Sequence, residues 1–529
     1  MRWNGHSGIP SHRNASSNIG GHERSEEMRS PCGRHCVDTV GRRDRDSRDH
    51  RSSYQRLPSL GLSAPNRSIA SRTSVFGAIL LFSLIVLLTS ASAQTFKGLY
   101  TFCSEARCSN GSAPSEQMVL DQEGNLYGTT ITGGANGIGD PAGFGTVFEL
   151  IPSSKKTKWR HKIIYSFGAQ PKCADGCYPY GVIMDNLGNL YGTTFTSDTG
   201  HGIAYKLAPN ARRTQWTLSV LHDFCELQGC ADGSGPIGRL TYAGASSGAF
   251  YDGNSPLYGT TGVGGSGKHC DWSSGCGTAF ELVPVGAGWQ QTVIYDFCSK
   301  ENCVDGYWPS GGLAEDASGN LYGTTTCGGR HGASTCATSS VGGTLFELEA
   351  AGAAPWVETV LHSFCAKAGC TDGQFPGMSV ITESDGRLFG TTRLGGQPCS
   401  TSMGTCGVAF EFGSGSPSKY TDLYDFCSLA DCADGFYPNA AMNVGALGVL
   451  FGTTYYGGGH DIDQNGVGGG TVFSLNGGLH VLYSFCAQSN CADGAYPSSL
   501  VMDGAGNLFG TTISGGNFYG GGTVFEVTP

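Results

Sequence analysis

One tetrapeptide recurs seven times along the chain at nearly constant spacing. It is an aromatic residue followed by Gly-Thr-Thr, and its aromatic residues are Tyr127, Tyr191, Tyr258, Tyr322, Phe389, Phe451 and Phe509. The steps between successive copies are 64, 67, 64, 67, 62 and 58 residues. Self-similarity at such a period is typical of a repeat architecture, so a chain of 529 residues need not contain several unrelated domains.

Each copy of the repeat contains four short strand-like runs. The last copy shows three of them, at 499–503 (SLVMD), 508–512 (LFGTT) and 522–527 (GTVFEV), and 481–485 (VLYSF) is an example of the fourth. Their composition is rich in β-branched and aromatic residues, and Gly, Asn and Asp lie between them. Four antiparallel strands form the blade of a propeller. The sequence therefore predicts an all-β fold, a seven-bladed β-propeller, over residues 94–529.

The two ends of the repeat region complement each other. The region begins with an unaccompanied fourth strand at 98–102 (GLYTF) and ends on a third strand at 522–527. We expect the N-terminal strand to pair in the last blade and close the ring, because closure removes an open sheet edge.

The segment before the repeats has a different character. Residues 1–72 are Arg-rich, polar and without periodicity, which predicts a disordered extension or a start codon assigned too early. Residues 75–88 are apolar and precede Ala91-Ser92-Ala93, so 73–93 are predicted to be a signal peptide cut after Ala93. The alternative is an uncleaved signal anchor, with residues 75–93 as the only contact with a membrane.

Charge excludes one class of partner. Of the 32 basic and 43 acidic residues, 13 and seven lie in residues 1–93, which leaves a net charge of −17 on residues 94–529. An acidic domain does not attract phosphate, so we expect neither nucleic acid nor anionic lipid as a partner. We expect a monomer whose partner is an extracellular glycan or protein.

Twenty cysteines follow residue 93, and they form ten close pairs. Such density is typical of oxidising compartments and predicts short-range disulfides. Zinc is the alternative, but pairs distributed one per blade do not converge easily on four ligands, so we predict no metal at the cysteines. The expected pairs are Cys103/Cys108, Cys173/Cys177, Cys225/Cys230, Cys270/Cys276, Cys298/Cys303, Cys327/Cys336, Cys365/Cys370, Cys399/Cys406, Cys427/Cys432 and Cys486/Cys491.

A second pattern lies in the crossovers from each fourth strand to the next repeat. An Asp-Gly follows the second cysteine, and an aromatic residue before Pro follows in most copies. One interpretation is an Asx turn with the aromatic residue wedged between blades. The other is a ring of carboxylates and aromatic faces around the axis that binds a glycan or calcium, with no other cofactor. The candidate ligand-binding residues are Asp175, Asp232, Asp305, Asp372, Asp434, Asp493, Tyr178, Trp308, Phe375, Tyr437 and Tyr496.

Two further repeated features have structural interpretations. Four tryptophans stand eight residues before the phenylalanine of the fourth strand and predict packing between blades: Trp159, Trp216, Trp289 and Trp356. The glycine of Gly-Thr-Thr is expected to let neighbouring backbones approach.

Catalytic motifs are absent from the sequence: it has no nucleophile elbow, zinc motif or phosphate loop. The best catalytic candidates are polar residues that occur once and break the repeat, in or beside the loops after the second strands. They are Asp271, Trp272, Arg330, His331, Arg393, His460, Asp461 and Asp463.

The repeat itself points to a family. The string Gly-Asn-Leu-Tyr-Gly-Thr-Thr followed by Gly-Thr-Val-Phe-Glu-Leu, first seen at 124–130 and 145–150, resembles the tandem repeat of "choice-of-anchor" GloVer-containing proteins over residues 98–529. The resemblance implies a bacterial protein that is exported and anchored at the surface in various ways, and it implies no activity. No C-terminal sorting tail follows the repeats up to Pro529, which is a departure from the pattern.

Three functions follow from these observations. The turns after the first strands are short and uniform, whereas the loops after the second and fourth strands are long, variable and rich in cysteine. Because binding residues concentrate on loops held by a rigid scaffold, we expect a secreted or surface-exposed binding module that uses the disulfide-bearing face. The alternatives are an extracellular polysaccharide hydrolase or lyase with acids in the axial funnel, and a structural surface protein.

Overall fold

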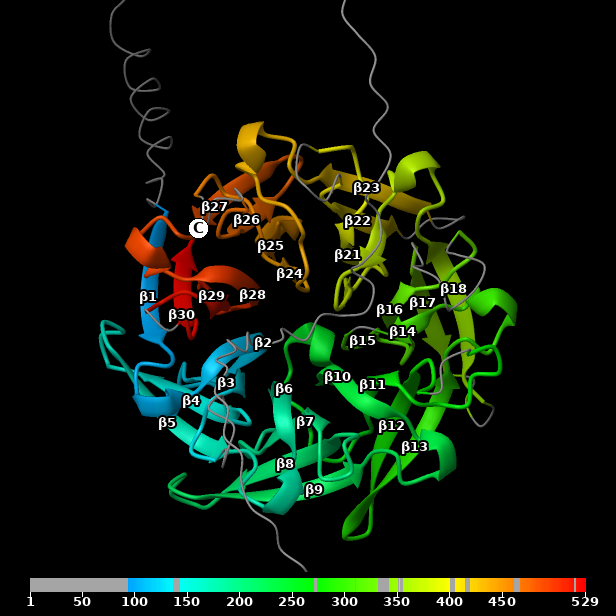
Figure 1. Ribbon diagram of the computed structural model, residues 1–529, viewed down its shortest axis with the longest axis horizontal. Coiled ribbons are helices and arrows are strands. Elements are labelled where there is room, and N and C mark those ends of the chain that lie inside the picture. The colour runs from blue at the N-terminus through cyan, green and yellow to red at the C-terminus, as the bar shows by residue number, and fades with distance from the viewer. Residues whose placement is uncertain are drawn as a thin grey trace, which may run out of the picture. The chain divides into compact units, whose positions relative to one another are not determined.

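Seven sheets of antiparallel strands stand as blades around an axis (Figure 1). The computed structural model describes residues 94–136, 143–270, 274–309, 311–331, 342–350, 352, 355–399, 405–413, 419–460, 467–517 and 520–529. Strands A to D run from the axis outward in each blade. The predicted seven-bladed β-propeller is confirmed. The predictions for residues 1–93 lie outside the described residues, and no helix within the described ranges is long and apolar enough to cross a membrane.

The first three blades are regular four-stranded meanders. Blade 1 holds β2 (Ser112–Leu120), β3 (Leu126–Thr132), β4 (Thr146–Pro152) and β5 (Trp159–Ser166). Blade 2 holds β6 (Cys177–Met184), β7 (Leu190–Thr196), β8 (Ile203–Pro209) and β9 (Trp216–Asp223). Blade 3 holds β10 (Ser234–Thr241), β11 (Leu257–Val263), β12 (Thr278–Val285) and β13 (Gly288–Asp296).

Strand A is interrupted or short in the next three blades. Blade 4 holds β14 (Tyr307–Pro309), β15 (Ala314–Glu315), β16 (Leu321–Cys327), β17 (Thr344–Glu349) and β18 (Val357–Ser363). Blade 5 holds β19 (Gln374–Pro376), β20 (Ile381–Thr382), β21 (Leu388–Leu394), β22 (Val408–Gly413) and β23 (Lys419–Asp425). Blade 6 holds β24 (Asn443–Val444), β25 (Leu450–Thr454), β26 (Thr471–Leu475) and β27 (Leu479–Ser484).

The last blade combines strands from opposite ends of the described chain. It holds β28 (Ala495–Met502), β29 (Leu508–Ser514), β30 (Thr523–Thr528) and, outermost, β1 (Thr95–Thr101). β1 runs antiparallel to β30, with Gly98 opposite Phe525 and Tyr100 opposite Val524. β30 therefore has a hydrogen-bonded neighbour on both sides.

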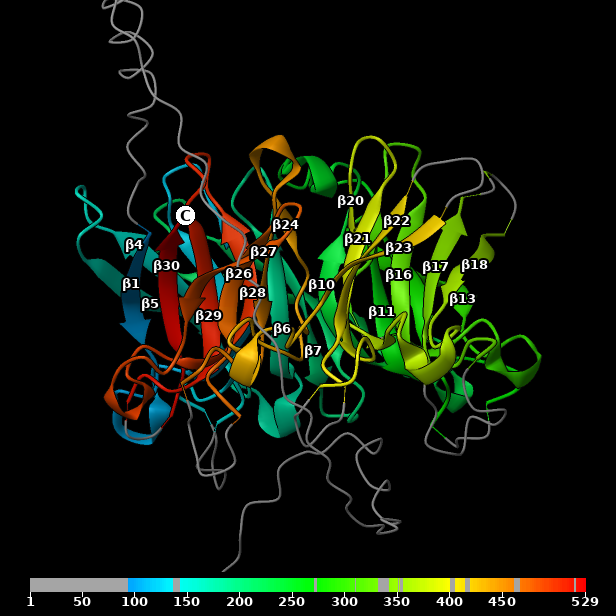
Figure 2. The ribbon, with the colours of Figure 1, turned by 90° about the horizontal axis from the view of Figure 1, so that it is seen from above.

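Each crossover from strand D to the next blade contains one short 3-10 turn that ends in a cysteine. These turns lie together along one face of the ring, the lower edge in Figure 2. They are η2 (Ala106–Cys108), η3 (Pro171–Cys173), η4 (Gln228–Cys230), η6 (Glu301–Cys303), η7 (Ala368–Cys370), η8 (Ala430–Cys432) and η10 (Ser489–Cys491).

Aromatic residues join every blade to the next. The phenylalanine that directly follows strand D is buried against an aromatic ring on strand C of the following blade, with ring centroids 5.0–5.2 Å apart. The contact recurs seven times and includes the junction between blade 7 and blade 1. The pairs are Phe102–Phe148, Phe167–Tyr205, Phe224–Phe280, Phe297–Phe346, Phe364–Phe410, Phe426–Phe473 and Phe485–Phe525.

A glycine and a proline form the second junction between blades. The glycine before each strand C has a φ of +86° to +105°, and a Cβ added to it would lie 2.5–2.8 Å from the Cδ of a proline in the next blade. Only glycine adopts this left-handed backbone readily and also lacks the Cβ that would clash with the proline. The pairs are Gly145–Pro179, Gly202–Pro236, Gly277–Pro309, Gly343–Pro376, Gly407–Pro438, Gly470–Pro497 and Gly522–Pro114.

The glycine of Gly-Thr-Thr has a different role from the expected one. A Cβ at Gly128 would lie 2.7 Å from the ring of Phe148 on the neighbouring strand, and the other six copies are equivalent. This glycine therefore makes room for the aromatic ring of strand C and not for a neighbouring backbone.

The tryptophans pack between blades, as predicted. Trp159 contacts Phe509 of blade 7, Trp289 contacts Tyr191 of blade 2, and Trp356 contacts Tyr258 of blade 3.

One A–B turn is not short. Fifteen residues join β10 to β11 in blade 3, and they include the 3-10 turn η5 (Ala245–Ser247). Tyr251 of this loop is fully buried and hydrogen-bonds to Met184 and Asn186 of blade 2. The A–B face therefore carries an elaborate loop, contrary to the expectation of uniform turns there.

The glycine–proline junction generates a prediction. Gly145→Ala forces alanine into a left-handed backbone and presses its Cβ on Pro179, whereas Gly124→Ala has a similar φ of +83° and nothing within 4 Å of its Cβ. We expect both variants to lose about 1 kcal/mol from the backbone and Gly145→Ala to lose about 1–3 kcal/mol more from overpacking. Thermal unfolding measures both midpoints, and equal midpoints would contradict a tight junction.

Candidate functional site

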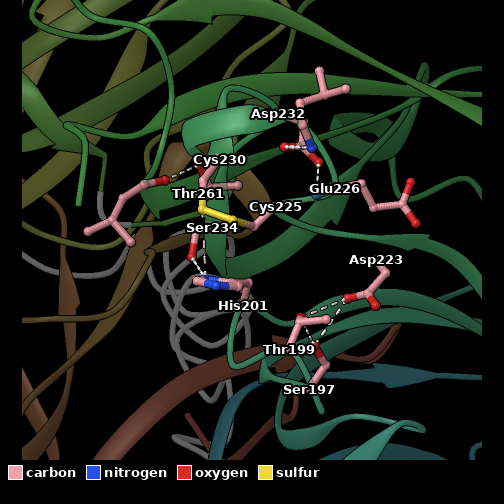
Figure 3. Close-up of a disulfide and its surroundings, with 12 residues drawn as sticks. Ser197, Thr199, His201, Asp223, Cys225, Glu226, Cys230, Asp232, Ser234 and Thr261 are labelled. Carbon is pink, nitrogen blue, oxygen red and sulfur yellow. Dashed lines mark hydrogen bonds between the residues drawn. A yellow bond between two sulfur atoms is a disulfide. The ribbon is translucent and has the colours of Figure 1, made fainter. Parts of the chain in front are cut away.

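Nine of the ten expected cysteine pairs are disulfide-bonded. The tenth pair includes Cys336, which lies outside the described residues. Each bond joins two cysteines that are only four to seven residues apart in sequence. The bonds therefore stabilise the local conformation of the crossovers and of the loops between strands B and C (the B–C loops). Figure 3 shows the crossover from blade 2, where Cys225–Cys230 lies beside His201, whose Nδ1 is 2.8 Å from the Oγ of Ser234.

The six crossover aspartates are buried, with exposed fractions of 0–3%. In the crossover that leaves blade 2, the Asp232 carboxylate accepts a hydrogen bond from the backbone N–H of Glu226 (Figure 3). It also accepts one from the N–H of Leu227, and its Oδ2 lies 3.2 Å from His222 Nε2. The other copies repeat this arrangement, with a tyrosine hydroxyl in place of the histidine at Asp175, Asp305, Asp434 and Asp493. Each carboxylate thus holds its own crossover, which favours the Asx-turn interpretation.

The first crossover has an asparagine in the place of the aspartate. The Asn110 Oδ1 accepts a hydrogen bond from the Glu105 N–H, and its Nδ2 donates to the hydroxyl of Tyr100. An amide can therefore replace the carboxylate as the hydrogen-bond partner of the crossover, because the tyrosine hydroxyl can accept a hydrogen bond as well as donate one.

The five crossover aromatic residues have left-handed backbones, with φ between +51° and +60°, and are partly exposed. Their N–H groups donate to the B–C loops of the preceding blade, as from Tyr178 to Phe144 and from Trp308 to Cys276. Tyr496 stacks on Tyr455 of that blade, with centroids 4.8 Å apart. These residues bridge blades. Their role in ligand binding, and that of the six aspartates, stays a prediction.

The loop candidates for catalysis do not form one site among the described residues. Arg330, His331 and His460 are exposed, whereas Arg393 donates from Nε to the side chain of Asn439. Four others, Asp271, Trp272, Asp461 and Asp463, lie outside the described residues.

Sulfur atoms from different pairs do converge in blade 5. The Sγ atoms of Cys399, Cys406 and Cys427 lie within 4.8 Å of one another, which brings together three sulfurs, one fewer than the four ligands of a structural zinc site. All three sulfurs are in disulfides, and a disulfide offers no thiolate to a metal.

A cavity of about 570 Å³ lies on the axis, between the A strands. It extends from the middle of the A strands to the A–B face, where Phe250 of the long blade 3 loop borders it. None of the eleven predicted ligand-binding residues lines it. Its volume is typical of small-molecule sites.

Most side chains that face the axis are small. The residue directly before the buried apolar residue of strand A occupies equivalent positions around the ring. Five of these residues have little or no side chain, which leaves the cavity open. The seven are Gln117, Gly181, Arg239, Gly312, Ser379, Ala441 and Ser499.

Two charged residues interrupt this pattern: Arg239 is one of the seven, and Glu116 directly precedes another of them, Gln117. Arg239 is the one basic residue that lines the cavity among the described residues, and Glu116 lies beside it on β2. A Cβ added to Gly181 would lie 3.0 Å from the Cβ of Glu116 and 3.7 Å from that of Arg239, so the side chains of both residues begin close to Gly181.

The backbone at Glu116 is unusual. Its φ is +65°. Like β6, β10 and β28, β2 changes register at this point, and both Glu116 and Gln117 line the cavity. A left-handed glutamate costs about 1 kcal/mol, and such strain concentrates at functional sites.

The pKa values of two carboxyl groups that line the cavity are raised toward neutral pH. Burial raises the pKa of Glu116 to about 7, although the charge of Arg239 opposes the rise. Burial, and then the charge of Asp316, raises the pKa of Glu315 to about 7. Carboxyls with such pKa values can donate or accept a proton near neutral pH, as ligand-binding and catalytic groups do.

Glu116, Arg239 and Glu315 were not predicted as site residues from the sequence, because they lie on or beside strands and the predicted catalytic residues are single-copy polar residues of loops. The signal was present. Alignment of the seven A strands with one another shows Glu116 and Arg239 as charged residues at positions where the other repeats carry none.

The chain shares its repeat with a described family. The family model of the Gloeobacter/Verrucomicrobia repeat matches residues 84–256 and 241–463. No curated protein matches the sequence.

Solved structures resemble the fold only distantly. The sialidase of Trypanosoma rangeli aligns with 72% of this chain at 10% identity and a TM-score of 0.36, and the chain spans 57% of its length. A gluconolactonase of Xanthomonas campestris aligns over 82% of this chain and 89% of its own, at 11% identity and a TM-score of 0.36. Likeness at this distance carries no weight for function.

The crossover geometry predicts different outcomes for two substitutions at Asp434. Asp434→Ala leaves the hydroxyl of Tyr424 and the N–H groups of Ser428 and Leu429 without their acceptor, so we expect a loss of about 1–3 kcal/mol of stability. Asp434→Asn should retain most of the stability, because Asn110 serves the first crossover in the same way. Thermal midpoints measure the difference. Wild-type stability in both variants, with loss of a ligand, would instead favour the ligand-ring interpretation.

Proposed function

The chain belongs to the Gloeobacter/Verrucomicrobia repeat family, and we propose that it is an exported binding module that holds the end of a glycan in its axial cavity. This proposal keeps the binding role expected from the sequence and moves the site from the disulfide-bearing face to the axis. The disulfides suit an oxidising compartment, which supports a secreted or cell-surface location.

One observation carries the proposal. The charged residues Glu116 and Arg239 stand in a ring of mostly small axial residues, next to free volume, and belong to no repeated structural contact. The repeated contacts that build the propeller explain the features that recur in each blade but give no reason for this pair of charges inside the ring.

The rest of the lining suits a sugar. The amides of Gln117 and Asn443 lie close together, with Nε2 and Oδ1 3.4 Å apart, and both donate to the carbonyl of Leu500. Ser379 and Ser499 add hydroxyl groups, and Phe250 adds an aromatic ring. Sugar hydroxyls bind such polar groups, while the apolar ring faces of sugars pack on aromatic side chains.

A glycan array with the purified protein tests this function. Ala441→Trp fills the cavity and should abolish binding, whereas Val357→Trp on the outermost strand of blade 4 should leave it unchanged. Trp308→Ala tests the disulfide-bearing face in the same assay. Loss of binding in Trp308→Ala but not in Ala441→Trp would contradict the axial site, and thermal midpoints of the three variants confirm that they are folded.

A second candidate is a polysaccharide hydrolase. It is favoured by the two carboxyls of the same cavity, Glu116 and Glu315, whose pKa values of about 7 suit an acid or base. Glycoside hydrolysis uses such a pair of carboxyl groups.

Release of reducing sugar from polysaccharides separates the two functions. A hydrolase should lose at least about a hundredfold in rate in Glu116→Gln and in Glu315→Gln, because general acid–base catalysis contributes that much. Its rate should peak near pH 7, where one carboxyl is protonated and the other ionised. A binding module releases no sugar, and its Glu315→Gln variant still binds glycan.

A further inference from the structure

We propose that the axial cavity selects a sugar that carries a carboxylate, such as a terminal uronic acid, with Arg239 as its partner. This inference rests on the proposed function and names the chemistry of its ligand.

The guanidinium of Arg239 is available to a ligand. It lies in the cavity, and among the described residues it forms no ion pair within 4.0 Å and no side-chain hydrogen bond. The acidic residues that line the cavity are Glu116, Glu315 and Glu383. A partly desolvated guanidinium without a fixed partner is a strong site for an anion, since its planar donors match a carboxylate in two parallel hydrogen bonds.

The charge of the lining limits the ligand to one negative charge. Arg239 is the one basic residue among the described lining residues, so a doubly charged phosphate would leave one negative charge without a partner. A carboxylate brings one charge and accepts two hydrogen bonds. The neutral groups of the lining include the hydroxyls of Ser379 and Ser499 and the amide oxygen of Gln117, which can accept hydrogen bonds from sugar hydroxyls.

The neighbours of Arg239 make this selection depend on pH. Glu116 on β2 is the carboxyl that interacts with it, and burial sets the pKa of Glu116 to about 7. Below pH 7 the carboxyl is neutral and Arg239 is unopposed. Above pH 7 the ionised carboxyl competes for Arg239 and repels the ligand, so affinity falls.

The remaining titratable groups near this pair act in the same direction or not at all. Glu315 on β15 loses its proton in the same range and adds repulsion at high pH. Glu383 is the third carboxyl of the same lining. Burial raises the pKa values of Tyr180 and Tyr242, which therefore stay neutral.

Calorimetric titration with matched 4-nitrophenyl glycosides tests the inference. The uronide and the neutral hexoside of glucose, galactose and mannose differ only at carbon 6, and a 6-sulfated hexoside tests a different anion. We expect one uronide to bind at least about tenfold more tightly than its neutral counterpart and no less tightly than its sulfated counterpart at pH 5.5, and to lose about tenfold in affinity between pH 5.5 and pH 8.5.

Variants assign the effect to residues. Arg239→Met keeps the side-chain stem and should remove the preference for the uronide, whereas Arg393→Met, an arginine bonded to Asn439 and not lining the cavity, should keep it. Glu116→Gln should retain most of the affinity at pH 8.5, and this variant decides the matter if Arg239→Met does not fold.

Three results would overturn the inference: equal binding of uronide and hexoside, tighter binding of the sulfated sugar, or binding of no uronide. Any of them, together with a neutral glycan bound in the array, leaves the proposed function standing. An array without any bound glycan contradicts the proposed function as well.

Discussion

Contact between neighbouring blades is the constraint on which the rest of the structure depends. Seven phenylalanines that follow strand D pack on strand C of the next blade. Seven glycines that precede strand C pack closely against a proline of the next blade. The junction between blade 7 and blade 1 has both contacts, in Phe102–Phe148 and Gly522–Pro114. The phenylalanine contacts lie along the middle and outer strands, and the prolines stand near the start of strand A. Cohesion of the ring therefore does not require large side chains at the axial positions further along strand A.

Packing between blades therefore does not fix which residues occupy the axial side of strand A. Strand A can carry glycine, serine or alanine on its axial side, is short or split in blades 4 to 6, and still holds its place. The crossover face is different, because its aspartates, aromatic residues and cysteines are occupied by bonds that hold the crossovers and bridge the blades. Residues that recur in every blade therefore build the ring, whereas Glu116 and Arg239 occur once and face free volume.

The fold could be predicted because its signals are local and repeated seven times. Turn residues, strand runs and the spacing of Gly-Thr-Thr lie within one blade, and the cysteine pairs are four to seven residues apart. The site could not be predicted, since it depends on which residues of separate blades meet at the axis. Glu116 faces Arg239 only because β2 changes register and Gly181 leaves space between them. Nor does spacing show that the crossover aspartates are buried and bonded to their own loops.

The central claim is that the ligand lies inside the ring and not on the disulfide-bearing face. A crystal structure of the purified protein soaked with a 4-nitrophenyl uronide at pH 5.5 tests it most directly. The account predicts difference density in the axial cavity, with the sugar carboxylate against the guanidinium of Arg239. Density confined to the crossover loops around Trp308 and Tyr437, with an empty axis, would contradict it.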